Sequence, residues 1–291
     1  MRPLKQRDLF VGDLHGMFHL LEALLSRIGF TPESDRLWGV GDFVDRGADP
    51  LSCVRFFRDT PGCGAVLGNH DAQFLSWWRN PQSTLTRQWK TQYGNGWLAR
   101  YSNSELAEIA DYLSTLPLSR EVQLSDGRAA GLVHAQQPPK VPFGAHLDWG
   151  VPEAFDEHGA SQPGYSLWSR NAAMVAKKVL RAVRHQQNDQ GNRPDLDNIH
   201  KPLAPNFDPV DNRVAISISG HTPFRDPPLP VLLGNHLFLD TMAFDPSGRL
   251  TIVDPVAKRV WQLPHSASES AHEAGLEVIE MPLPAAILPG S

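Results

Sequence analysis

The sequence predicts an α/β fold built on a parallel sheet, and two observations support this. Short apolar runs at residues 9–11, 37–40 and 65–67 each lead into a cluster of polar residues, and the intervals between them can hold one helix plus loops. Strand–helix–strand units of this kind form a parallel sheet whose carboxyl ends share one edge. The polar clusters at 12–16, 41–47 and 68–71 should therefore meet in one site.

The first third of the chain supplies these elements in order. Apolar residues at helical spacing follow the first strand over residues 17–28, and Gly29 is a natural helix end. A second helix is predicted over about 51–57, before the turn at Pro61 and Gly62, and the third strand follows.

The middle of the chain combines helices with a hairpin. Residues 71–116 have helical character, with a break predicted at 93–96 and a new helix start at Ser102, which forms a capping-box pattern with Glu105. Residues 121–124 and 129–133 read as a hairpin whose second strand runs into His134. A long loop is predicted at 137–164, a helix at 172–183 and a surface excursion at 185–212.

The last part of the chain predicts a further strand end and a closing sheet. Residues 214–219 alternate like a strand and lead into the sequence Gly-His-Thr-Pro at 220–223. Residues 237–240, 250–253 and 260–263 are expected to form an antiparallel meander, and the tripeptide at 234–236 a turn. We therefore expect one domain over 1–263 and a tail over 264–291 with at most one short strand, near 276–279.

Composition narrows the class of protein. The 291 residues contain 27 Lys plus Arg against 32 Asp plus Glu, a net charge of −5, which argues against broad nucleic-acid binding and requires local cations for an anionic substrate. No 18-residue apolar run and no signal-peptide pattern occurs, so we expect a soluble cytoplasmic protein without a membrane partner. The only cysteines, Cys53 and Cys63, are expected to be free thiols in a reducing compartment, although a disulfide between them is possible.

The polar residues at the strand ends form a set of candidate metal ligands. Taken singly, an Asp or Asn after a strand is more often a turn former or helix cap, and a lone His more often satisfies a core hydrogen bond. Together they are oxygen and nitrogen donors without a thiolate, which suits Mn²⁺, Fe or Zn²⁺. The set comprises Asp13, His15, Asp42, Asn69, His134 and His221. The clusters predict a dinuclear metal-dependent phosphoesterase.

Five motifs, in this order and at these intervals, resemble the calcineurin-like metallophosphoesterases. They are Gly-Asp-Leu-His-Gly at 12–16, Gly-Asp-Phe-Val-Asp-Arg-Gly at 41–47, Gly-Asn-His-Asp at 68–71, Val-His-Ala at 133–135 and Gly-His-Thr-Pro at 220–223. The resemblance covers about 8–242 and is strongest to the branch that holds PPP-type serine/threonine phosphatases and symmetrical diadenosine tetraphosphate hydrolases. It implies a βαβαβ fold with mixed sheets packed as a sandwich flanked by helices. Pro223 stands where the wider superfamily often has a second His.

The resemblance also implies a ligand set for two divalent ions. It assigns Asp13, His15 and Asp42 to the first ion, and Asp42, Asn69, His134 and His221 to the second, so that Asp42 bridges them. The ions, Mn²⁺ in the first place with Fe or Zn²⁺ as alternatives, would activate a water as hydroxide for attack on phosphorus.

The same resemblance implies roles for residues that bind no metal. His70 would protonate the leaving group and Asp45 would orient its imidazole. Arg46 and Arg170 would bind the phosphate, although a surface Arg beside a packed Trp is the alternative for Arg170. Asp240 receives no chemical role, because Met242 replaces the Gly of the family's Asp-Thr-Gly.

Three functions remain open. The leading one is hydrolysis of phosphomonoesters in the manner of a protein phosphatase, favoured by Gly-His-Thr-Pro and the intact Asp45-Arg46 pair, with a phosphorylated protein or a small phosphoester as substrate. The alternative is a symmetrical dinucleoside polyphosphate hydrolase, whose nucleotide pocket the two long loops could shape. The remote alternative is a metal-free binding scaffold, which should carry ligand substitutions; the motifs carry none.

Overall fold

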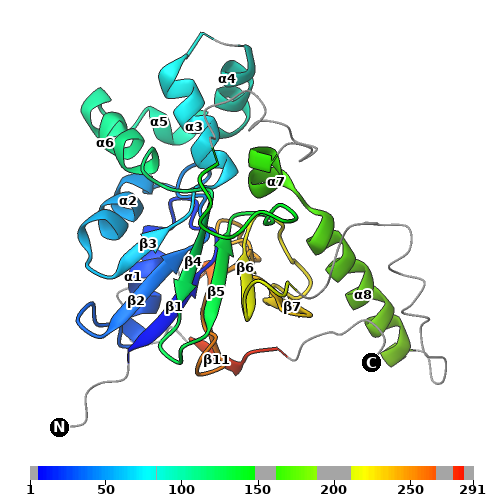
Figure 1. Ribbon diagram of the computed structural model, residues 1–291. Helices are drawn as coiled ribbons and strands as arrows, with labels where there is room; N and C mark the ends of the chain where they lie inside the picture. The colour runs from blue at the N-terminus through cyan, green and yellow to red at the C-terminus, as the bar shows by residue number, and fades with distance from the viewer. Residues whose placement is uncertain (1–5, 83, 148–161, 189–210, 267–277, 285–291) are drawn as a thin grey trace.

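Two mixed β-sheets pack against each other, and helices flank them, as Figure 1 shows. The computed structural model describes residues 6–82, 84–147, 162–188, 211–266 and 278–284. The predicted α/β fold with sandwiched mixed sheets is confirmed.

The first sheet contains the predicted parallel strands at its centre and edge. In spatial order it comprises β11 (Ile279–Pro282), β10 (Arg259–Pro264), β9 (Arg249–Asp254), β1 (Arg7–Val11), β2 (Asp35–Gly39) and β3 (Cys63–Ala65). β1, β2 and β3 are parallel, whereas β9, β10 and β11 add antiparallel strands on the other side of β1. The carboxyl ends of the three parallel strands therefore lie at one edge.

The second sheet brings two more strand ends to the same region. Its order is β4 (Ser119–Gln123), β5 (Ala129–Val133), β6 (Ile216–Ser219), β8 (His236–Phe238) and β7 (Val231–Leu233). β4 and β5 form the predicted hairpin, and β5, β6 and β8 are parallel. The strands that lead into His134 and His221 are thus direct neighbours.

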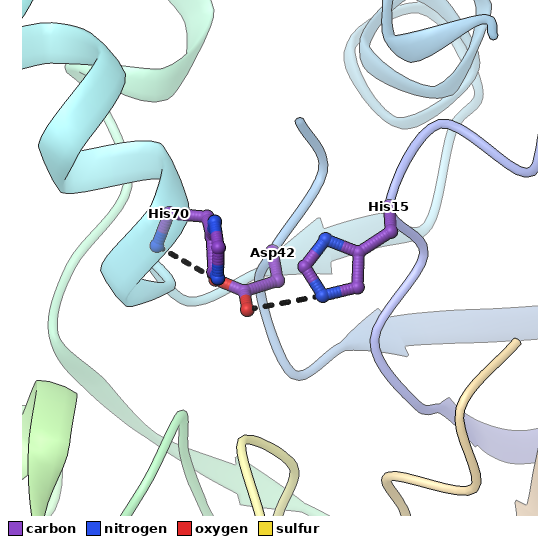
Figure 2. A group of neighbouring side chains, drawn as sticks. All are labelled: His15, Asp42 and His70. Atoms are coloured by element: carbon purple, nitrogen blue, oxygen red, sulfur yellow. Dashed lines mark hydrogen bonds and ion pairs between the residues drawn. The ribbon is translucent and has the colours of Figure 1, made fainter. Parts of the chain in front are cut away.

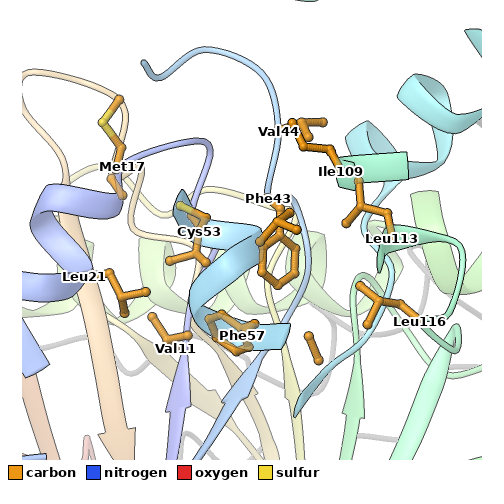
Figure 3. Packing of buried hydrophobic residues seen from close by; sticks show 14 of the residues in the cluster. Val11, Met17, Leu21, Phe43, Val44, Cys53, Phe57, Ile109, Leu113 and Leu116 are labelled. Atoms are coloured by element: carbon orange, nitrogen blue, oxygen red, sulfur yellow. The ribbon is translucent and has the colours of Figure 1, made fainter. Parts of the chain in front are cut away.

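Helices α1 (Phe18–Arg27), α2 (Pro50–Asp59), α3 (Asn69–Arg79) and α6 (Asn103–Leu113) form one core with the first sheet. Alternation along β1 separates the two cores: Leu9 and Val11 face the helices, whereas Phe10 lies in the core between the sheets. Figure 3 shows Val11 and Leu21 packed near Phe57, with Phe43 beside Leu113 of α6. This packing holds the strand ends in place.

The helical region between α3 and α6 differs from the expected break at 93–96. The chain continues from α4 (Thr84–Trp89) through a π-helical segment, η1 (Lys90–Gly94), into α5 (Asn95–Leu98). A π-helix accommodates the extra residues of a turn without ending the helix, so the Gly-containing sequence widens it instead. The capping box at the start of α6 is confirmed: the Glu105 N–H donates to the Ser102 hydroxyl, and the Ser102 N–H to the Glu105 carboxylate.

The predicted antiparallel meander is confirmed for its last two strands, β9 and β10, and is wrong for its first. β8 belongs to the second sheet, parallel to β6, while β9 and β10 pair in the first sheet. Apolar alternation identifies a strand but carries no information about its partner, and residues 239–248 carry the chain from one sheet to the other. Gly234 and Asn235 form the predicted turn, but His236 begins β8.

The connecting segments are partly described. Residues 137–147 contain no helix or strand, α7 (Gln162–Trp168) begins within the predicted loop, and 148–161 lie outside the described residues. α8 (Asn171–Asn188) extends the predicted helix, and most of the excursion at 185–212 lies outside the described residues. The one short strand expected in the tail is present as β11, slightly later than predicted, paired with β10. Cys53 and Cys63 are free thiols.

Candidate metal centre

Three hydrogen bonds tie four of the five strand-end loops to one another. The His15 N–H donates to the Asp42 carbonyl over 2.7 Å, and the Gly220 N–H donates to the His134 carbonyl over 2.9 Å. The two sheets are joined by the His221 N–H, which donates to the Asp13 carboxylate over 3.1 Å. The six predicted ligands are brought into one buried cluster, with exposed fractions of 0 to 7%.

Two glycines permit this close approach. A Cβ at Gly68 would overlap the Asp42 carboxylate, and a Cβ at Gly220 would overlap the Asp13 carboxylate. Both glycines precede a predicted ligand, Asn69 and His221 respectively. At these positions any side chain would displace a carboxylate of the cluster.

Backbone strain is concentrated in the same cluster. His15, Asp42, Asp45, Arg46 and His221 all adopt positive φ, between 44° and 71°. Non-glycine residues in this region are uncommon, and each costs about 1–3 kcal/mol when the surrounding structure imposes it. The fold thus holds five of the predicted site residues in conformations that they would not adopt on their own.

Asp42 lies at the centre of the cluster. Its Oδ2 is 3.5 Å from His15 Nε2, and its Oδ1 accepts the His70 N–H over 3.0 Å; Figure 2 draws both contacts. Its Oδ1 also lies 3.5 Å from His134 Nε2. Among the described residues, two groups have ligand atoms within 4.8 Å of one another, and Asp42 belongs to both: His15–Asp42–His70 and Asp13–Asp42–His134. Burial would raise the pKa of Asp42, but the imidazoles of His134, His70 and His15 outweigh it and lower the pKa.

The other carboxylates are held in a crowded, buried environment. Burial raises the pKa of Asp13 well above its usual value, and the nearby carboxylates of Asp240 and Asp42 add to the effect. Burial likewise raises the pKa of Asp240 to about 6. Asp240 accepts the Met242 N–H over 2.9 Å, and Met242 has a φ of 62° where the family has a glycine. Carboxylates this close and this buried require positive charge nearby.

The histidines of the second sheet fit a cation. His134 Nδ1 donates to the Val40 carbonyl over 2.8 Å, so Nε2 of the neutral ring carries a lone pair. That lone pair faces the Asn69 carbonyl oxygen at 2.7 Å, and His221 Nδ1 lies 2.9 Å from the same oxygen. Burial lowers the pKa of both histidines, which favours the neutral, ligating form. The His134 lone pair and the Asn69 oxygen point at each other, an arrangement that suits a shared metal ion, and the donor set without sulfur suits Mn²⁺, Fe or Zn²⁺.

His70 and Asp45 form a buried pair next to Asp42. His70 Nδ1 donates to Asp45 Oδ2 over 2.6 Å. Burial would lower the pKa of His70, but the carboxylates of Asp42 and Asp45 raise it instead. Because Nδ1 is bound to Asp45, the Nε2 atom is the one that can exchange a proton with another group.

The two predicted phosphate-binding arginines lie at the rim of the cluster. The Arg46 guanidinium stacks on the Phe244 ring at 3.9 Å and lies 2.9 Å from His15 Nε2 and 3.2 Å from His70 Nε2. Arg170, between α7 and α8, donates to His221 Nε2 over 3.3 Å. Both side chains are solvent-exposed and adjoin the predicted ligands, as phosphate binding requires.

Sequence reasoning missed three residues that hold this site. Asp71 accepts the N–H groups of Gly68, Asp42, Phe43 and Val44 and so ties the 41–47 loop to α3. Trp89 and Trp97 donate to the Asp45 carboxylate. The position of Asp71 directly after the Gly-Asn-His sequence was a usable signal, whereas nothing in the sequence connects either tryptophan with Asp45.

A small pocket adjoins the cluster. It has a volume of about 200 Å³ and is lined by Arg46, Gly47, Ala48, Gly96, Trp97 and Arg100. Within the described part of the chain its lining contains two guanidinium groups and no carboxylate. A larger hollow of about 730 Å³, between α2, β3 and α6, contains none of the predicted site residues.

Comparison with known proteins gives one family match and several relatives that match over part of their length. The family model described as "Calcineurin-like phosphoesterase" matches residues 7–225. Two relatives are named "Bis(5'-nucleosyl)-tetraphosphatase, symmetrical". The protein from Shewanella sp. (strain MR-7) is 37% identical over 133 residues, which cover 45% of this chain and 44% of the relative. The protein from Shewanella frigidimarina is 29% identical over 180 residues, which cover 60% of this chain and 58% of the relative. The matches therefore span roughly half of these relatives.

A similar fold occurs in a solved structure. A protein serine/threonine phosphatase from Saccharomyces cerevisiae with similarity to human phosphatase PP5 superimposes with a TM-score of 0.52 at 13% identity, covering 99% of this chain and 82% of that chain. At this identity the likeness concerns the fold alone.

Among the described residues, no helix is long and apolar enough to cross a membrane.

Proposed function

The chain belongs to the calcineurin-like phosphoesterase family, and from this premise we propose that it is a metal-dependent hydrolase that cleaves dinucleoside polyphosphates. The observation that carries the proposal is the gathering of five other nitrogen and oxygen donors around the carboxylate of Asp42 in one buried cluster, beside a cationic rim. The proposed function is the one that the sequence analysis gave as the alternative, and it replaces protein dephosphorylation, which the sequence analysis placed first.

The proposed ligand set is the one that the resemblance to the family implies. Asp13, His15 and Asp42 would hold one divalent ion, and Asp42, Asn69, His134 and His221 the other. When bound, the two ions would neutralise phosphate charge and lower the pKa of an attacking water. In the arrangement described, Arg46 lies on His15 Nε2, so it would have to leave this nitrogen when His15 binds a metal.

The other site residues would handle the phosphate and the proton. Arg46, next to His15, and Arg170, next to His221, would bind phosphate oxygens. As the new bond from water to phosphorus forms and the bridging P–O bond breaks, His70 Nε2 would donate its proton to the departing oxygen. Asp45, bound to Nδ1, would keep the imidazole in the required orientation.

Two observations support a dinucleoside polyphosphate over a phosphoprotein. The relatives with 29 to 37% identity are named as symmetrical bis(5'-nucleosyl)-tetraphosphatases, whereas the likeness to a protein phosphatase is at 13% identity. In addition, the pocket that contains Arg100 extends the cationic rim beyond the single phosphate that Arg46 and Arg170 would bind. A tetraphosphate chain needs such additional cations, and a phosphomonoester does not.

A substrate panel tests the proposal. The purified protein is reconstituted with Mn²⁺ and assayed with diadenosine tetraphosphate, p-nitrophenyl phosphate, and phosphoserine and phosphotyrosine peptides. We expect kcat/KM for diadenosine tetraphosphate to exceed that for either peptide by about tenfold or more, equivalent to 1.4 kcal/mol, with ADP as the only product. Faster hydrolysis of a phosphopeptide would instead support the protein-phosphatase function, and no hydrolysis of any substrate would support a binding scaffold.

A further inference from the structure

The carboxylate of Asp45 is held by two tryptophans in addition to His70. Trp97 Nε1 donates to Asp45 Oδ1 over 2.8 Å, and Trp89 Nε1 donates to Asp45 Oδ2 over 2.8 Å. Asp45 is fully buried, and both tryptophans are 2% exposed. Indole N–H groups can only donate, so both carboxylate oxygens are fixed as acceptors whatever His70 does.

The helix that carries both tryptophans is shaped for this contact. Residues eight positions apart in an α-helix differ by about 80° in their direction around the axis. The π-helical segment Lys90–Gly94 lies between Trp89 and Trp97, and its wider turns lower the rotation per residue. The two indoles therefore return to one side of the helix, where both reach Asp45.

We infer that Trp89 and Trp97 are positioning residues, a clamp that fixes the Asp45 carboxylate so that His70 presents Nε2 to the leaving oxygen. The inference rests on the role of His70 in the proposed function. Without the clamp, the carboxylate could rotate about its χ angles, and the imidazole bound to Oδ2 would turn with it. The neighbouring bonds from Arg46 to His15 and His70 involve other atoms and do not restrain Asp45.

The first test is kinetic. Trp89→Phe and Trp97→Phe remove the N–H but retain an aromatic ring, and Trp77→Phe is the control, because Trp77 packs on Phe74 and Trp89 in the same aromatic cluster. We expect both clamp variants to lose about tenfold in kcat on phenyl phosphate, whose leaving group needs a proton, and little on p-nitrophenyl phosphate, with KM and bound metal unchanged. The control should lose activity equally on both, or not at all.

The second test is a stability cycle that needs no activity. In Asp45→Asn, the amide oxygen can keep the bonds from His70 and Trp89, so the amide NH₂ must face the indole N–H of Trp97. The amide NH₂ and the indole N–H are then two donors that face each other without an acceptor, which destabilises the fold. Trp97→Phe removes the indole N–H and should therefore reduce this destabilisation. The double variant Asp45→Asn/Trp97→Phe should thus be more stable in urea than the sum of the single changes predicts, whereas pairing Asp45→Asn with Trp77→Phe should be additive.

Comparing His70→Asn with the tryptophan variants distinguishes a failure of the clamp from a failure of the proposed function. If His70→Asn slows both aryl phosphates equally, the acid role in the proposed function is wrong, and the catalytic purpose of the clamp is wrong with it. If His70→Asn is selective for phenyl phosphate but the clamp variants behave like Trp77→Phe, only the clamp is overturned. An additive cycle for Asp45→Asn with Trp97→Phe would also overturn it.

Discussion

Individual residues at the candidate metal centre occupy conformations that only the assembled fold can impose. The φ angle of Asp42 is 55°, and its N–H donates to the buried carboxylate of Asp71 over 2.9 Å. Burial and the nearby Asp42 carboxylate raise the pKa of Asp71 to about 7, while four backbone N–H groups favour its ionised form. Asp71 therefore stabilises a strained loop that presents Asp42 to the cluster.

Replacement of Asp42 should damage the centre more than replacement of any other ligand, because its carboxylate belongs to both groups of ligand atoms. Asp42→Asn is expected to lose both Mn²⁺ ions and nearly all activity, whereas Asn69→Ala, which removes a neutral ligand, should retain at least one ion. Metal content by atomic emission and kcat/KM would measure this. Two tightly bound ions with normal rates in Asp42→Asn would contradict the bridging assignment.

His70→Asn separates proton donation from metal binding. A general acid contributes about 10²- to 10⁴-fold, and its contribution grows with the basicity of the leaving group. The variant should keep both metals, yet lose far more rate on phenyl phosphate than on p-nitrophenyl phosphate, and Asp45→Asn should show the same bias more weakly. Loss of a metal from His70→Asn would show that His70 is a metal ligand. This alternative is definite, because the ligand atoms of His15, Asp42 and His70 lie within 4.8 Å of one another.

The residues of the centre were largely predictable because each follows an apolar run. Asp13, Asp42 and Asn69 follow β1, β2 and β3, and parallel strands place their carboxyl ends together. Trp89 and Trp97 could not be predicted, because their contact with Asp45 depends on a π-helical segment for which the sequence has no reliable signal.

The positions of the strands along the chain were predictable from the sequence, and their pairing partners were less so. The strand predicted at 237–240 is present as β8 at His236–Phe238, yet it pairs with β6 and not with β9. Alternation with a period of two residues shows that one face of a strand is buried. Strands of both sheets bury such a face in the core between the sheets, so the pattern does not tell to which sheet a strand belongs.

A partly buried ion pair joins β1, β2 and the turn before β2. Arg7 Nε donates to Asp35 Oδ1 over 2.8 Å, and the Thr31 N–H donates to Asp35 Oδ2 over 2.9 Å. Burial would raise the pKa of Asp35, but these hydrogen bonds outweigh it and lower the pKa. A carboxyl with a lowered folded-state pKa contributes stability above its unfolded value, near 3.9, and loses it as the pH falls through the folded value.

Asp35→Asn should accordingly destabilise the fold by about 1–3 kcal/mol at pH 7, and the difference from wild type should shrink below about pH 4. Urea unfolding at pH 7 and pH 3 measures this. Asp126→Asn is the control, because Asp126 pairs with Arg128 at the surface, where ion pairs contribute little. A difference that grew in acid would show that the carboxylate is not the stabilising form.

The turn after α5 supplies the second cation of the rim pocket. If Arg100 binds the distal phosphates of a polyphosphate, Arg100→Ala should lower kcat/KM for diadenosine tetraphosphate by about tenfold or more and leave p-nitrophenyl phosphate unaffected. Arg128→Ala, an exposed arginine in the β4–β5 turn, is the control. Equal losses on both substrates would place Arg100 in a structural role instead.

The candidate metal centre lies where the two sheets meet. The proposed ligands of the first ion, Asp13, His15 and Asp42, all follow strands of the first sheet, whereas the second ion would also take His134 and His221 from the second sheet. The second ion would therefore tie the sheets together, and the first would not.

Metal binding should stabilise the fold, and it should do so mainly through the second ion. An ion that binds only the folded state adds about 2.7 kcal/mol when its free concentration is 100 times its Kd. His134→Ala and His15→Ala each remove one imidazole, but only His134→Ala removes a ligand that connects the sheets. Thermal unfolding in EDTA and in excess Mn²⁺ should show a large Mn²⁺-dependent rise in Tm for wild type, most of it retained in His15→Ala and most of it lost in His134→Ala. The reverse order would mean that the ion within the first sheet carries the stabilisation, and an unchanged wild-type Tm would mean that the buried carboxylates do not bind the metal at all.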